Sequence, residues 1–93
     1  MTAREITSAI GPLLQQLGMM GIKISGSRYD ANSFGNFYVD CRGAKGSFRI
    51  VRDRSQYFLD GDVADIKKHG LFKAYDSVQE FTDAALKYAK AFA

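Results

Sequence analysis

The stretch that decides the fold reads FYVDCRGAKGSFRIV and covers residues 37–51. Apolar and polar side chains alternate on both sides of its glycines, which is the pattern of half-buried β-strands. Phe37, Val39 and Cys41 therefore share one face of the first strand. The connection Gly43-Ala44-Lys45-Gly46 supplies two glycines for positive φ, so the stretch predicts a β-hairpin.

Two further runs extend this hairpin to four strands. Residues 22–25 alternate with period two, and residues 57–59 are apolar throughout, which leaves their facing ambiguous. In the strand over 48–51, Phe48 and Ile50 face inward. Residues 30–33 and 53–55 are short polar connections. The sequence therefore predicts a four-stranded antiparallel meander.

The segment before the strands predicts an amphipathic helix. Thr2 and Glu5 fit a capping box, in which Thr2 accepts from a free amide and Glu5 reaches back to the amide of Thr2. Pro12 predicts a kink near Gly11 or a helix that restarts there, and Gly18 or Gly21 ends the helix. An apolar stripe follows the cap, formed by Ile6, Ile10, Leu13, Leu14 and Leu17.

The segment after the strands predicts two more helices. Asp62 caps a short helix from Val63 to about His69, and Ser77 with Glu80 makes a second capping box. The long helix behind it carries an apolar stripe of Val78, Phe81, Ala85, Ala89 and Phe92, flanked by Leu86 and Tyr88. Because each terminal helix has one stripe and the sheet one apolar face, both helices should cover that face. The predicted fold is a two-layer α+β domain in the order α-β-β-β-β-α-α.

Length and composition indicate a single globular domain over residues 1–93. Ile, Val, Leu and Phe together number 23 of the 93 residues, above the level at which chains tend to stay disordered. One cysteine and one histidine cannot form an internal disulfide or a structural zinc site. No apolar run is long enough to span a membrane, and the N-terminus lacks the apolar core of a signal peptide. We expect a soluble, cytoplasmic protein.

The residue types and their spacings do not indicate a catalytic site. His69 suits a helix C-terminus better than a general base, and Cys41 shares the inward face of its strand, where a thiol is unreactive. The acids at 60, 62 and 65 do not match a calcium loop, which needs a glycine at its sixth position and a glutamate at its twelfth. Gly43 to Ser47 lacks the context of a phosphate loop. We therefore expect neither an enzyme nor a cofactor or metal site.

Positive charge is concentrated in one segment of a weakly basic chain. The whole chain has a net charge of +3, whereas residues 42–54 alone carry five cations and one acid. These cations are Arg42, Lys45, Arg49, Arg52 and Arg54. If they contact phosphates while Tyr29, Tyr38 or Tyr57 stack on bases, the protein is a nucleic-acid binder. Solubilising charges on a strand pair are the plainer interpretation.

The sheet face away from the helices is the candidate binding surface. Strand alternation places Tyr38, Val51 and, on the fourth strand, Phe58 on this face, with charged residues around them. Tyrosine and arginine are enriched in binding hot spots. We therefore favour a protein-interaction module that uses the open sheet face or an edge strand, with a homodimer left open. The candidate partner-binding residues are Tyr29, Tyr38, Arg42, Arg49, Val51, Arg52, Arg54 and Phe58.

A short pattern resembles a group of small uncharacterised bacterial α+β proteins. Its residues are Phe34-Gly35-Asn36 followed by Arg52-Asp53-Arg54-Ser55-Gln56. Some proteins of this kind look like immunity proteins, which neutralise a toxin by binding it. The resemblance covers about the middle third of the chain and implies an immunity-like role. In physical terms, Gly35-Asn36 also suits a turn or bulge, and Asp53 a tight turn.

Overall fold

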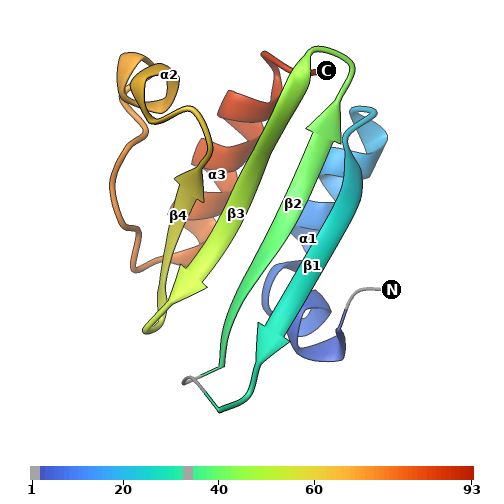
Figure 1. The fold of residues 1–93 in the computed structure, drawn as a ribbon, viewed down its shortest axis with the longest axis vertical. Helices are drawn as coiled ribbons and strands as arrows, with labels where there is room; N and C mark the ends of the chain where they lie inside the picture. The colour runs from blue at the N-terminus through green and yellow to red at the C-terminus, as the bar shows by residue number, and fades with distance from the viewer. Residues whose placement is uncertain (1–2, 33–34) are drawn as a thin grey trace.

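The computed structural model describes residues 3–32 and 35–93 and confirms the predicted α+β fold. The elements run in the predicted order and are named as in Figure 1. They are α1 (Arg4–Met19), β1 (Lys23–Asp30), β2 (Asn36–Gly43), β3 (Gly46–Asp53), β4 (Gln56–Asp60), α2 (Val63–Lys68) and α3 (Val78–Ala89).

The four strands form an antiparallel meander in the order β1-β2-β3-β4. The β2–β3 hairpin pairs Gly43 with Gly46 across a two-residue turn, as its glycines predict. Of these two glycines, Gly46 has a positive φ, of 150°, and Gly43 does not, so the expectation that both supply one is wrong for Gly43. Gly43 is needed for space instead, because a Cβ atom there would collide with the backbone carbonyl of Phe92.

Both long helices lie on one face of the sheet, as predicted. Figure 1 shows α1 behind β1 and β2, and α3 behind β3 and β4, with the opposite face of the sheet uncovered. The inward strand residues Val39, Cys41 and Ile50 are fully buried against this helix layer, together with Ile6 and Phe81. Burial alternates along β2, which confirms the predicted inward facing of Phe37, Val39 and Cys41.

Helix α1 is kinked, and its end follows one of the two predicted alternatives. Ile10 has non-helical angles (φ −133°, ψ 23°), one residue before the expected break. Pro12 thereby falls in the first turn of the second half, where its missing N–H is tolerated. At the other end, Gly21 has φ 85°, and the amide of Ile22 donates to Leu17 O at 2.9 Å, which is a Schellman cap. The predicted cap Thr2 lies outside the described residues, and Ala3 is the N-cap.

The caps of the last two helices agree with the sequence. Asp62 accepts from the amide of Asp65 at 3.1 Å, and Ser77 Oγ accepts from the amide of Glu80 at 3.2 Å. The predicted stripe of α3 is wrong at Val78, the first residue of the helix, which is 41% exposed. Tyr88, expected on the flank, is fully buried between Phe48 and Phe92.

A β-bulge in β1 changes which of its residues face the helices. Ile24 pairs with Cys41, but Gly26 pairs with Asp40, so one extra residue lies in β1. Side chains alternate with period two, and one inserted residue therefore reverses the facing of the rest of the strand. Beyond the bulge, Gly26 and Arg28 belong to the open face, while Ser27 and Tyr29 belong to the helix side.

Candidate functional site

The open sheet face carries one cross-strand row with three large apolar or aromatic side chains. The register aligns Arg28 with Tyr38, Tyr38 with Val51, and Val51 with Phe58, one residue from each strand. We call these four residues the aromatic row. Tyr38, Val51 and Phe58 are half-buried and Arg28 is exposed. Neighbouring side chains in such a row lie about 5 Å apart, so these make one continuous strip.

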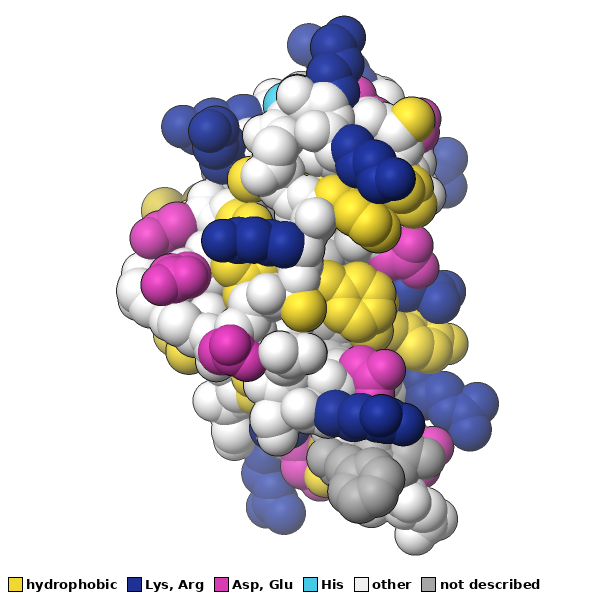
Figure 2. All heavy atoms as spheres, turned by 90° about the vertical axis from the view of Figure 1, so that its left-hand side faces the viewer, with side chains coloured by type: hydrophobic (Ala, Val, Ile, Leu, Met, Phe, Trp, Pro, Cys, Tyr) yellow, Lys and Arg dark blue, Asp and Glu magenta, His cyan; other side chains and the backbone are white. Residues whose placement is uncertain are grey.

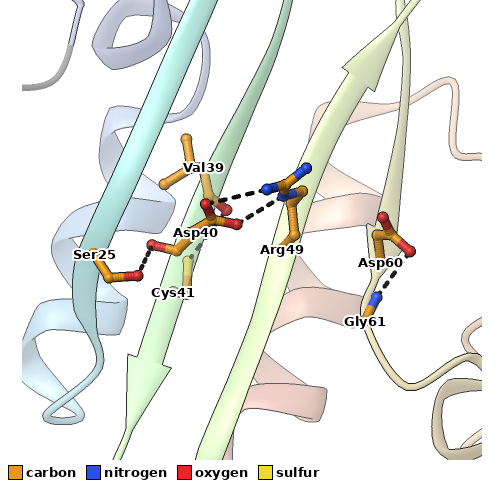
Figure 3. Close-up of polar contacts among 7 residues, drawn as sticks. All are labelled: Ser25, Val39, Asp40, Cys41, Arg49, Asp60 and Gly61. Carbon is orange, nitrogen blue, oxygen red and sulfur yellow. Dashed lines mark hydrogen bonds and ion pairs between the residues drawn. The ribbon is translucent and has the colours of Figure 1, made fainter.

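A row of charges lies directly beside the aromatic row. Asp40, Arg49 and Asp60 are aligned across β2, β3 and β4, as Figure 3 shows. Arg49 Nε donates to Asp40 Oδ1 at 2.7 Å, and Arg49 NH2 donates to Asp40 Oδ2 at 3.3 Å. The Arg49 guanidinium also lies 4.0 Å from the ring centre of Tyr38. The hydrogen bond to Asp40 raises the pKa of Arg49 above its usual value.

The opposite side of the aromatic row is held by hydrogen bonds near the β3–β4 turn. Asn36 Nδ2 donates to Asp53 Oδ1 at 3.0 Å, and Asn36 Oδ1 accepts from the amide of Arg54 at 2.9 Å. Arg52 NH1 donates to Gly35 O at 3.4 Å. The described residues of the two halves of the short pattern, 35–36 and 52–56, therefore meet at one end of the sheet. Their hydrogen bonds hold this end of the sheet together, and Phe34 lies outside the described residues.

The aromatic row lines a shallow hollow of about 500 Å³ on the open face. Arginines and aspartates surround the apolar strip, and both signs are present in equal number around it. Figure 2, which views the molecule from the side of β4 and α2, also shows charged side chains around hydrophobic ones. The lining residues are Arg28, Asp30, Asn36, Phe37, Tyr38, Arg49, Val51, Arg52, Asp53, Phe58 and Asp60.

The structure brings together five of the residues predicted from the sequence around the hollow. Tyr38, Arg49, Val51 and Phe58 have the outward register on adjacent strands, and Arg52 also lines the hollow. The facing of residues 57–59, left ambiguous by the sequence, is resolved, because Tyr57 and Leu59 are buried and Phe58 is only half-buried.

Tyr29 does not belong to this face. It pairs with Phe37 and packs against the core, so its placement on the open face is wrong. The physical cause is the bulge before Gly26, which reverses the facing of the rest of β1.

The other predicted basic residues are dispersed. Arg42 is exposed at the end of β2 next to the 44–45 turn, whereas Arg54 lies in the turn at the opposite end of β3. Arg52 has the inward register of Phe37 and Tyr57, and its guanidinium lies 5.8 Å from the Tyr57 ring centre. Its Nε is a buried nitrogen without a hydrogen-bond partner among the described residues. The cations of segment 42–54 therefore do not form one patch.

The sequence analysis did not identify Arg28 as part of this face. It also did not predict that Asp40 orients Arg49 beside Tyr38. The signal for Arg28 was the glycine at position 26, since an isolated glycine in a strand pattern indicates a bulge. Asp40 and Arg49 are nine residues apart and lie opposite each other once Gly43 pairs with Gly46, so the predicted hairpin turn was the signal for this pair.

Cys41, His69 and Asp65 make structural contacts away from the hollow. Cys41 is fully buried, and burial raises its pKa to about 12, so its thiol stays protonated. His69 Nδ1 lies 2.9 Å from the backbone oxygen of Asp65, and the Tyr88 hydroxyl donates to Asp65 Oδ2 at 2.9 Å. The first contact lies within α2 and its C-cap, and the second joins α2 to α3. Within residues 3–32 and 35–93, no three His, Cys, Asp or Glu side chains are grouped to hold a metal ion.

Comparisons with known proteins add no assignment. No family model matches the chain, and no curated protein and no solved structure matches it. Of the helices in the described part of the chain, none has the length and apolar character needed to cross a membrane.

Proposed function

We propose that this chain is a non-enzymatic protein-binding domain that docks a protein partner on its open sheet face. The observation that carries the proposal is the aromatic row, which lies uncovered on the face opposite both long helices. Apolar side chains gathered on an exposed surface and rimmed by polar ones are typical of protein-interaction sites. The proposal places the domain in the cytoplasm, where a free cysteine such as Cys41 stays reduced.

The residues of this face suit a binding hot spot. Tyr38 and Phe58 offer large apolar surfaces that still lose water on docking, because both are only half-buried. Arg49 is already oriented by Asp40 and by the Tyr38 ring, so less side-chain freedom is lost when a partner binds.

The charges around the hollow favour a protein over a polyanion. Its lining contains the cations Arg28, Arg49 and Arg52 and an equal number of aspartates. Nucleic-acid binding instead depends on an excess of cations along a phosphate backbone. The dispersal of the 42–54 cations over both ends of β3 gives that alternative less support.

An immunity-like role is the form of this function that we propose. A small domain that neutralises a toxin needs a preformed docking face and no chemistry of its own. The support is the open face together with the short pattern resemblance described above.

The test is a comparison of three baits in affinity capture from host lysate. Wild-type protein should retain one protein in near-stoichiometric amount at both about 0.1 M and 0.5 M salt, because an apolar interface resists screening. The Tyr38→Ala, Phe58→Ala double variant should lose it. The control variant Phe72→Ala, Val78→Ala removes two other exposed hydrophobic residues and should retain it.

Two outcomes would contradict the proposal. One is equal retention by both double variants, with circular dichroism showing that each is folded. The other is retention of nucleic acid at low salt that is lost at high salt, which would favour the nucleic-acid alternative.

A further inference from the structure

The positive charge of the chain is concentrated at one end of the molecule. Figure 1 shows that the end of α1, the start of β1, the β2–β3 turn, α2 and the end of α3 all lie at this end. The ranges 19–25, 41–48, 60–70 and 86–93 form it, and they contain seven of the 13 lysines and arginines but three of the ten acids. The rest of the chain has six cations and seven acids. The positive net charge therefore comes from this end.

Three cations of this end have no acidic partner among the described residues. Lys23, Arg42 and Lys45 are all exposed, and the ion pairs between described residues involve Arg49 and His69 instead. Lys23 lies directly opposite Arg42 across β1 and β2, where like charges repel. The lysines of α2 and α3 complement helix dipoles, whereas these three cations lie in strands and a turn and have no such role.

The acids of this end lie on its other side and make local contacts. Asp60 Oδ1 accepts from the amide of Gly61 at 2.8 Å, and Asp62 caps α2. Asp65 Oδ2 accepts from the Tyr88 hydroxyl at 2.9 Å. Figure 1 shows the end of β4 and α2 across the sheet from the start of β1. The side formed by β1 and the β2–β3 turn is therefore the more positive one.

Two exposed apolar side chains lie on this positive side. Met19, at the end of α1, is 82% exposed, which is the largest exposed fraction among the large hydrophobic residues. Ile24 is 42% exposed and lines a hollow of about 600 Å³ with Lys23 and Arg42. Gly21, two residues after Met19, lines the same hollow. Exposed apolar side chains beside cations are typical of proteins that bind to the surface of an anionic membrane.

We propose that Met19, Lys23, Ile24, Arg42 and Lys45 bind the surface of an anionic lipid bilayer. We call these five residues the hairpin end. The cations attract acidic head groups, and Met19 and Ile24 enter the boundary between head groups and acyl chains. An anionic surface also relieves the repulsion between Lys23 and Arg42. The charged row separates the hairpin end from the aromatic row, so the proposal does not depend on protein docking.

Two other anionic partners fit the hairpin end less well. Phosphates of a nucleic acid would contact its cations but leave Met19 and Ile24 in water, and single strands also need aromatic side chains, which the hairpin end lacks. An acidic protein segment held by charge alone would leave the same two side chains exposed. A bilayer uses both the cations and the apolar side chains.

The first experiment measures cosedimentation with lipid vesicles. Each cation near an anionic surface strengthens binding about fivefold. The wild type should therefore bind vesicles with about one quarter phosphatidylserine at least tenfold more tightly than pure phosphatidylcholine vesicles, and lose most of this preference at about 0.5 M salt. Lys23→Glu should weaken binding at least tenfold. Arg4→Glu, at the opposite end of α1, changes the net charge equally and should bind as the wild type does.

The second experiment tests whether Met19 enters the bilayer. The chain has no tryptophan, so Met19→Trp introduces a single fluorescent reporter. Its emission should shift to shorter wavelengths when phosphatidylserine vesicles are added. Val78→Trp is the matched control, because Val78 is 41% exposed but lies at the start of α3, at the other end of the molecule, and its emission should not shift.

Four results would overturn the proposal. They are equal binding to both kinds of vesicle, equal weakening by Lys23→Glu and Arg4→Glu, no emission shift at position 19, and the same shift at positions 19 and 78. Binding of a DNA duplex or of polyglutamate that Lys23→Glu weakens, without binding to phosphatidylserine vesicles, would assign the hairpin end to that partner instead. Circular dichroism of each variant shows that it is folded.

Discussion

Arg49 is the residue that connects the charged row to the aromatic row. It donates to Asp40 and lies over the ring of Tyr38, so one side chain organises both rows. Because the side chains of Arg49 and Asp40 are 40% and 34% exposed, water screens the ion pair. The pair should therefore contribute more to the shape of the face than to folding stability.

The first prediction concerns this ion pair. A double-mutant cycle of Arg49→Ala and Asp40→Ala should give a coupling energy below about 1 kcal/mol in the free energy of unfolding, because exposed pairs contribute little. Urea denaturation of the four proteins measures it. A coupling of several kcal/mol would mean that the pair is a structural element of the core instead.

Gly43 allows a second prediction, about space. Gly43→Ala should lower the free energy of unfolding by about 1–3 kcal/mol, because its Cβ would meet the backbone of Phe92, which cannot rotate away as a side chain does. Gly18→Ala is the matched control. No atom lies within 4 Å of a Cβ at Gly18 in α1, so this change should stabilise the protein by about 0.5–1 kcal/mol. Equal effects at both sites would contradict the packing around Gly43.

Cys41 leads to a prediction about pH. Burial raises its pKa from 9.0 to about 12, so the unfolded chain loses the thiol proton at lower pH than the folded protein does. The stability that this thiol contributes is therefore complete below pH 9 and declines between pH 9 and 12. Urea midpoints measured across this range should fall more steeply for the wild type than for Cys41→Ala. The same slope in both proteins would argue against a buried, protonated thiol.

At the scale of elements, the strands and helices with one clear apolar face were predictable. The alternation in 37–51 was enough for β2 and β3, and Asp62 and Ser77 were enough for two helix starts. Simple alternation of side chains did not predict the facing of β1, because the bulge before Gly26 reverses the facing of the residues that follow it. Tyr29 was misplaced for this reason, and Arg28 was overlooked. A short apolar run such as 57–59 gives no facing until a neighbouring strand and helix bury one side of it.

The β3–β4 turn gives a prediction at this scale. Arg54 and Ser55 have φ values of 53° and 69°, a region unfavourable to residues with a Cβ. Ser55→Gly should therefore raise the free energy of unfolding by about 0.5–1 kcal/mol. Ser47→Gly in strand β3 should instead lower it by a similar amount, since glycine weakens regular strands. Thermal or urea denaturation tests both, and destabilisation by Ser55→Gly would contradict the turn conformation.

For the whole molecule, the arrangement in two layers follows from the number of apolar faces. Two helical stripes and one apolar sheet face leave a single economical packing, which is why the architecture could be predicted. The candidate site was harder to predict, because it consists of residues from four strands that only the register brings together. Charge density along the sequence was misleading, since neighbouring residues such as Arg52 and Arg54 differ in facing and environment.

The central claim is that the open sheet face contacts a protein, and site-specific photo-crosslinking tests it most directly. A benzoylphenylalanine would replace Phe58 in the aromatic row or, as a control, Phe72, which is 49% exposed and outside the lining of the hollow. After irradiation in the host cell, Phe58-substituted protein should give one discrete protein adduct and Phe72-substituted protein none. No adduct at position 58, or the same adduct from both positions, would contradict the account.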